Sequence, residues 1–196
     1  MAENKAFEME AVKNEKGDNI ESVEKQTNPK AALTKKQKRR QLVKNILIAT
    51  LWVIVFEGIG AGLGIAFGAN DWYDDLNKSP LTPPGVVFSI VWPILYCMLA
   101  IYGWWNSNNL KDAPHKYLFF YFWFQMACNW MWTPVYFGWH EQVVGLVLLV
   151  CTVITVLYMV LKLMYLRDWW LALLLTPYLV WCSFATYLNA YTIENN

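Results

Sequence analysis

The sequence predicts an all-α integral membrane bundle of five transmembrane helices that follows a disordered N-terminal tail. Of its 196 residues, 57% are hydrophobic and 16% are charged, which is too apolar for an ordinary soluble domain. The charges gather at the start, because residues 1–44 hold 11 of the 16 Lys and Arg residues and 7 of the 15 Asp and Glu residues. We therefore divide the chain into a charged cytosolic tail, residues 1–44, and a transmembrane domain, residues 45–193.

The tail consists of an acidic block, residues 3–24, and a basic block, residues 25–44. It has too few apolar residues to offset the entropy of ordering, which predicts disorder. The basic run at residues 35–44 is expected to attract anionic lipid head groups by about 1 kcal/mol per basic residue. We do not expect a nucleic-acid partner, because the apolar segment that follows commits the chain to the bilayer.

Five apolar segments follow, each close to the roughly 20 residues that span a hydrocarbon core. They are residues 46–67, 86–105, 117–137, 143–161 and 169–191. All five should be α-helices, since an open sheet would leave unpaired backbone groups in lipid and the segments lack the alternation of barrel strands. Pro93, Pro134 and Pro177 fall within the second, third and fifth helices.

The charges of the loops predict the orientation in the membrane. The net charge is negative in the first and third loops and after the fifth helix, and positive in the second and fourth loops. By the positive-inside rule the N-terminus lies in the cytosol and the C-terminus on the opposite side. The alternation also favours an odd number of helices.

Twelve tryptophans divide into two groups of six. Those at segment ends, where indoles anchor at the membrane interface, are Trp72, Trp104, Trp105, Trp139, Trp169 and Trp170. The others lie within the spans, where an indole N–H needs a partner and the ring hinders close helix packing. These are Trp52, Trp92, Trp123, Trp130, Trp132 and Trp181, and we expect some of them to line a cavity.

Two helices carry polar stripes at helical spacing. The stripe of the third helix is Gln125, Asn129, Trp132 and Tyr136, and that of the fifth is Tyr178, Trp181, Ala185 and Asn189. Interhelical hydrogen bonds of roughly 0.6 to 2 kcal/mol and contacts to a ligand explain the amides equally well. Two facing stripes of this kind predict an apolar slot with a few hydrogen-bonding groups.

The first helix contains four alternate glycines and one acid. Gly58 with Gly62, and Gly60 with Gly64, form G-x-x-x-G pairs that admit a close neighbour, either a helix of the same subunit, which we favour, or a second copy in a homodimer. Glu57 lies at the middle of this helix, where an ionised carboxylate costs at least about 2.5 to 3.5 kcal/mol. It is therefore a proton or substrate site, or a neutral acid bonded to another helix.

Catalytic and metal-binding patterns are not found in the sequence. His115 and His140 are expected on opposite sides of the membrane, so they cannot share a metal or haem iron. The four cysteines lie in apolar segments without zinc-type spacing and should be reduced, buried thiols. We expect no enzymatic activity, no metal and no obligatory cofactor.

Three blocks carry a resemblance to a known family. They are residues 72–84 with 91–96, residues 129–134 with 137–138, and residues 177–181 with 183–189. In order and spacing they resemble the translocator protein family, also called the peripheral benzodiazepine receptor or tryptophan-rich sensory protein family. The resemblance covers residues 46–193.

The resemblance implies a five-helix bundle, often a homodimer, that binds porphyrins such as haem and protoporphyrin, cholesterol and benzodiazepine-type ligands. By motif, the ligand-binding residues would be Tyr73, Pro83, Pro84, Trp92, Asn129, Trp132, Trp181 and Ala185. Two departures stand out. Leu81 replaces the family's Trp, so one aromatic wall of the pocket or its lid should be missing. The cholesterol motif of the fifth helix lacks its cation, so sterol binding should be weak or use another surface.

Three functions compete on this basis. They are a receptor or sensor for porphyrins and other flat lipophilic ligands, a transporter of porphyrin or cholesterol, and a light-dependent porphyrin-degrading enzyme. The sequence favours the first, since five helices do not divide into the equal repeats common in carriers and no acid/base pair supports catalysis. The long polar tail suits a eukaryotic protein of the mitochondrial outer membrane or endoplasmic reticulum.

Overall fold

The computed structural model describes residues 34–196, and within them every regular element is a helix. The elements are α2 (Lys35–Phe67), α3 (Asp71–Asp75), α4 (Gly85–Ser107), α5 (Ala113–Thr133), the π-helix η1 (Pro134–Gly138), α6 (Gln142–Tyr165) and α7 (Trp169–Asn195). The chain forms two units, one that ends at Leu47 and one that spans Ile48–Asn196, and we describe them separately.

The predicted all-α membrane bundle is confirmed. Four helices, α2, α4, α6 and α7, are long and apolar enough to cross a membrane. The fifth, α5 with η1, matches the predicted third segment and is less apolar because it carries the buried amides of Gln125 and Asn129. It packs against α4 and α6, so it belongs to the same bundle.

The first helix begins at Lys35, well before the predicted start at residue 46. Thr34 and Gln37 form a capping box there, in which each side chain accepts a hydrogen bond from the backbone N–H of the other, at 3.3 and 2.8 Å. Extending a helix is easier than starting one, so the Lys- and Arg-rich segment continues the apolar helix. The predicted disorder is therefore wrong for residues 35–44, and residues 1–33 of the predicted tail lie outside the described residues.

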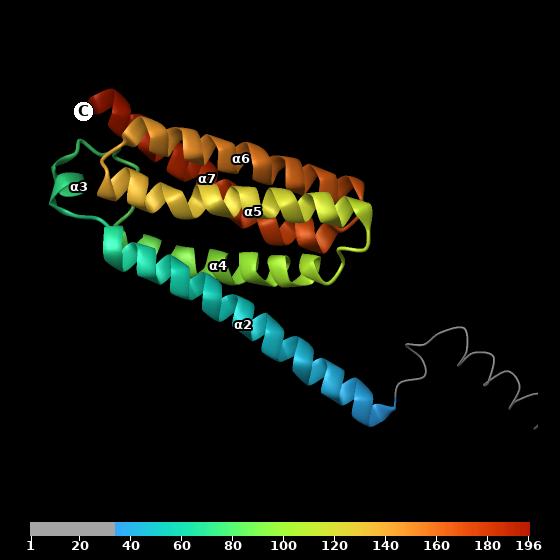
Figure 1. The fold of residues 1–196 in the computed structure, drawn as a ribbon. Helices are drawn as coiled ribbons and strands as arrows, with labels where there is room; N and C mark the ends of the chain where they lie inside the picture. The colour runs from blue at the N-terminus through green and yellow to red at the C-terminus, as the bar shows by residue number, and fades with distance from the viewer. Residues whose placement is uncertain (1–33) are drawn as a thin grey trace, which may run out of the picture. The chain divides into compact units, whose positions relative to one another are not determined.

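In the second unit, α4, α5, α6 and α7 run side by side (Figure 1), with the closest packing of α6 against α7 and of α5 against α6. The part of α2 after Leu47 joins them mainly through aromatic side chains. Phe56, its one fully buried residue, stacks on Phe122 at 5.9 Å between ring centroids and meets Trp130 edge-on at 5.4 Å. The core of the bundle therefore lies between α4, α5, α6 and α7, and α2 covers one side of it.

The glycines of α2 do not pack as predicted. A Cβ at Gly60 would collide with the ring of Tyr96, so α4 does approach α2 closely at that position, through a side chain. No atom lies within 4 Å of a Cβ built at Gly58, Gly62 or Gly64. The expected same-subunit partner for the Gly58 and Gly62 pair is therefore wrong, because that face of α2 points away from the bundle.

The prolines lie where the sequence predicts, and Pro134 has a structural consequence. Pro93 and Pro177 are inside α4 and α7, whereas Pro134 starts the π-helical turn η1. The N–H of Trp139 bonds to the carbonyl of Pro134 at 2.9 Å, which closes the wider π turn. This turn carries Tyr136 and Phe137 into the end of the bundle that holds the cavity described next.

Candidate functional site

A cavity of about 1010 Å³ lies inside the second unit, at the upper end of the volumes common for small-molecule sites. Its walls come from α2, the loop over residues 68–84, α4, the α5–η1 segment and α7. Seven of the eight predicted ligand-binding residues line it: Tyr73, Pro83, Pro84, Trp92, Asn129, Trp132 and Ala185. Residues far apart in the sequence thus converge on one space.

Trp181 is the predicted residue that does not line the cavity. It lies behind the wall, where its ring meets Trp92 perpendicularly at 6.5 Å and Phe88 at 5.4 Å. Its indole nitrogen is buried and has no hydrogen-bond partner among residues 34–196. Trp181 therefore supports Trp92 instead of forming the surface itself.

The inner end of the cavity is closed by two hydrogen bonds between helices. The hydroxyl of Tyr96 donates to Asn129 Oδ1 at 2.9 Å, and one turn deeper the hydroxyl of Tyr178 donates to Gln125 Oε1 at 2.8 Å. Phe122 lies a further turn away on α5 and is fully buried. The two amides of the predicted stripe thus bond between helices, and Asn129 also faces the cavity.

The wall between α5 and α7 confirms that the two predicted stripes face each other. The indole N–H of Trp132 donates to Asn189 Oδ1 at 3.2 Å, and the Asn189 amide donates to the carbonyl of Gln142 at 3.0 Å. Trp132 also stacks on Tyr136 at 5.2 Å between ring centroids, and the Tyr136 hydroxyl lies 3.0 Å from Thr192 Oγ1. Because its edge is bonded, the Trp132 ring is held in place beside the cavity.

The loop over residues 68–84 covers the cavity at the end of the bundle near the C-terminus, where α3 lies in Figure 1. Asn70 caps α3 by accepting from the N–H of Tyr73 at 3.1 Å, and its amide donates to the carbonyl of Phe137 at 3.0 Å. On the other side, Asn77 bonds to the backbone of Asn195 and the side chain of Asn196 at 3.0 and 2.9 Å. The loop is therefore fastened to both η1 and α7.

Leu81, which stands where the resembled family has Trp, points away from the cavity. Leu81 is 63% exposed and does not line the cavity. Leu81 is therefore not part of the cavity wall, whose aromatic lining includes Trp92, Trp132 and Tyr73, and a missing aromatic lid at this position stays a prediction.

Three charged side chains line the cavity, Glu57, Asp74 and Lys78. The ammonium of Lys78 donates to the carbonyls of Tyr73 and Asp74 at 2.7 and 2.9 Å and lies 4.7 Å from the centre of the Tyr73 ring. Burial and the neighbouring Asp74 carboxylate raise the pKa of Tyr73, so this phenol stays neutral. Glu57 Oε1 accepts a hydrogen bond from the thiol of Cys97 at 3.3 Å.

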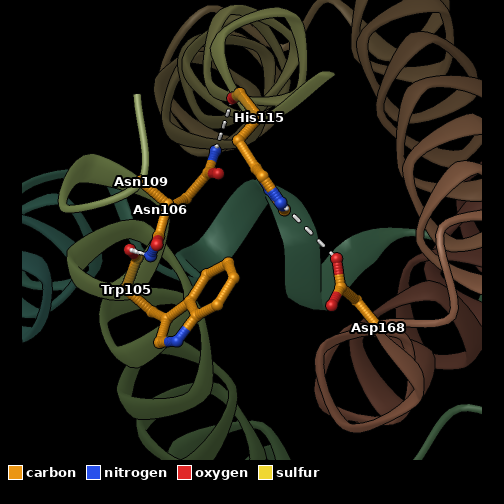
Figure 2. Close-up of polar contacts among 5 residues, drawn as sticks. All are labelled: Trp105, Asn106, Asn109, His115 and Asp168. Carbon is orange, nitrogen blue, oxygen red and sulfur yellow. Dashed lines mark hydrogen bonds and ion pairs between the residues drawn. The ribbon is translucent and has the colours of Figure 1, made fainter. Parts of the chain in front are cut away.

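A separate polar cluster lies at the opposite end of α5 (Figure 2). His115 points toward Asp168 at 3.5 Å, while the buried Asn106 donates from its amide to the carbonyl of His115 at 3.1 Å. These contacts join the start of α5 to the end of α4 and the start of α7. His140 lies at the other end of the α5–η1 segment, stacked on Trp72 at 4.2 Å. The two histidines are therefore at opposite ends of the bundle, as predicted.

The comparisons with known proteins agree with this architecture. The sequence profile of the TspO/MBR family matches residues 48–194. Protein CrtK of Rhodobacter capsulatus is 31% identical over 143 residues, which are 71% of this chain and 89% of that protein. The tryptophan-rich sensory protein of Cereibacter sphaeroides is 32% identical over 67% of this chain and 81% of its own length. The translocator protein of Homo sapiens is 34% identical over 60% of this chain and 70% of its own length. This chain therefore belongs to the TspO/MBR family of membrane sensory and translocator proteins.

Proposed function

We propose that this protein is a membrane receptor or sensor that binds porphyrins, such as haem and protoporphyrin, and other flat lipophilic ligands in the cavity under the loop over residues 68–84. Benzodiazepine-type molecules and sterols belong to the same ligand class. The observation that carries the proposal is the juxtaposition of two tryptophan rings, Trp92 and Trp132, with one amide, Asn129, around a cavity large enough for a porphyrin. Aromatic walls with few polar groups are what a flat apolar ligand requires.

The shape of the cavity favours binding over passage through the bundle. It ends at the bonded pair of Tyr96 and Asn129, and beyond that pair the core is filled by side chains such as Leu99 and Phe122, both fully buried. A carrier would need to open this packed core, and interiors at native density resist that change. No acid/base pair lies among the lining residues at hydrogen-bond distance, so a polar hydrolytic mechanism gains no support.

The proposal also covers the membrane, the orientation of the chain in it and the assembly of the protein. We place it in a bilayer as a multi-pass protein with a cytosolic N-terminus, and, if the source cell is eukaryotic, in the mitochondrial outer membrane or endoplasmic reticulum. The positive loops at the His115 end and the negative loops at the cavity end support this orientation. A homodimer through the face of α2 that holds Gly58 and Gly62 is the assembly we propose, since within residues 34–196 nothing lies within 4 Å of a Cβ built at either glycine.

The test is to reconstitute the full chain in phosphatidylcholine nanodiscs and vesicles. Protoporphyrin should quench the tryptophan fluorescence saturably, at a stoichiometry of one per chain. Porphyrin trapped in vesicles should not cross faster than in protein-free vesicles, and bound porphyrin should keep its absorption spectrum in darkness and in light. Rapid flux would favour the transporter, and loss of the spectrum in light would favour the degrading enzyme.

A further inference from the structure

Glu57 is a carboxylate in the wall of the cavity, at the middle of the apolar part of α2. It lines the cavity together with Gly60 and Ala61 of the same helix, opposite the aromatic residues of α4 and α5. Its side chain is half-buried, so it is open to the cavity and not sealed in the core. An acid at this depth is rare and marks a functional site more often than a structural one.

Within the described residues, no protein group satisfies this carboxylate well. Its hydrogen bond comes from the thiol of Cys97 at 3.3 Å, and a thiol is a weak donor. The ammonium of Lys78 donates to two carbonyls of the loop over residues 68–84, called the covering loop from here on, and no ion pair joins it to Glu57. The hydroxyl of Tyr96 is committed to Asn129. One side of the Glu57 carboxylate thus faces the cavity without a donor.

The missing donor defines a class of ligand. Hydrogen bonds from a charged N–H group to a carboxylate are about twice as strong as neutral ones, and their strength rises in an apolar surrounding. A flat ligand with a basic nitrogen at this position would pair the carboxylate, whereas a carboxylate of the ligand would meet repulsion there. An acidic substituent would instead be placed toward Lys78 at the covering loop.

We propose that Glu57 makes the cavity selective for flat lipophilic ligands that carry a basic, N–H-donating nitrogen. The inference rests on the proposed function of the cavity as a site for flat ligands, and adds the charge that the site prefers. Glu57 then acts as a specificity-determining residue, and the aromatic side chains of the cavity supply the affinity that charged and uncharged ligands share.

The experiment compares two flat probes of similar size, an aminoacridinium cation and uncharged anthracene. Both are titrated against the full chain in nanodiscs of zwitterionic phosphatidylcholine, with empty nanodiscs as the baseline. Glu57→Gln keeps the shape of the side chain and removes its charge. We expect this change to weaken the binding of the cation on the order of tenfold, which corresponds to one lost charged contact, and to leave anthracene within about twofold.

A matched control separates the local carboxylate from the general field of the site. Asp75→Asn removes an exposed acid of the same covering loop that does not line the cavity, and should leave the preference for the cation within about twofold. The inference is overturned if Glu57→Gln binds the cation as tightly as the unmodified protein does, or if Asp75→Asn reproduces the full loss. In both cases binding of anthracene would leave the proposed function standing. If neither anthracene nor protoporphyrin binds the unmodified protein, the proposed function fails, and the inference fails with it.

Discussion

Tyr96 on α4 and Asn129 on α5 form the hydrogen bond that closes the inner end of the cavity, with a distance of 2.9 Å between the phenolic oxygen and Oδ1. Both residues are more than nine-tenths buried, yet both line the cavity. The bond therefore contributes to the stability of the bundle and also helps to shape the inner end of the cavity.

Tyr96→Phe should destabilise the bundle, because it leaves the Asn129 oxygen without its partner. Hydrogen bonds between membrane helices contribute about 0.6 kcal/mol on average and up to about 1.7 kcal/mol. We expect a loss of that size in unfolding by sodium dodecyl sulfate in mixed micelles. Tyr158→Phe is the control, since Tyr158 is exposed on α6 and makes no side-chain hydrogen bond in the described part of the chain. Equal stability of the two variants would contradict a structural role for the Tyr96 hydroxyl.

Asn77→Ala should speed the release of ligand. The Asn77 amide donates to the carbonyl of Asn195 and so fastens the covering loop to the end of α7, whereas the bonds to the Asn196 side chain come from the backbone of Asn77 and remain in the variant. Loss of the side-chain bond to Asn195 removes one of the contacts that fasten the loop and leaves the helices intact. Unfolding should therefore change little, while protoporphyrin dissociation measured by stopped flow should accelerate several-fold. Asn108→Ala, which removes a bond to the carbonyl of Trp104 at the opposite end of the bundle, should leave the rate alone. Identical release from both variants would show that the loop does not retain the ligand.

Cysteines introduced at Asp74 and Lys111 should react with an impermeant maleimide from opposite sides of the membrane. Both positions are exposed, and they lie in loops at opposite ends of α4. The native cysteines are buried or half-buried and should label slowly. In sealed vesicles of one orientation, labelling of both introduced cysteines from the same side would rule out the proposed topology.

The helices could be predicted because apolar length alone specifies a transmembrane helix. The start of α2 could not, since hydropathy says nothing about a capping box at Thr34 and Gln37 that lets a basic segment extend an existing helix. Helical spacing correctly placed Asn129, Trp132, Ala185 and Asn189 on facing stripes. It failed for Trp181 because a stripe spans a wide arc, and a large ring at its edge can turn toward the neighbouring α4.

The contacts that fasten the covering loop could not be predicted from the sequence either. Asn77 and Asn195 are separated by 118 positions, and no local pattern connects two such asparagines. The glycines of α2 illustrate the reverse case. Their spacing permits a close helix neighbour, but in the described part of the chain the fold presents Gly60 to α4, and no neighbour lies against Gly58 or Gly62.

The most direct test of the central claim is the affinity for protoporphyrin of Trp132→Ala compared with Trp169→Ala, in the same nanodiscs. Trp132 lines the cavity, whereas Trp169 is 58% exposed at the start of α7 and is not among the lining residues. Loss of stacking of roughly 0.5 to 1.5 kcal/mol beyond burial, together with the lost contact area, predicts a tenfold or larger weakening for Trp132→Ala. Trp169→Ala should retain the original affinity. If both folded variants bind equally weakly, or both bind as the unmodified protein does, the ligand does not occupy this cavity.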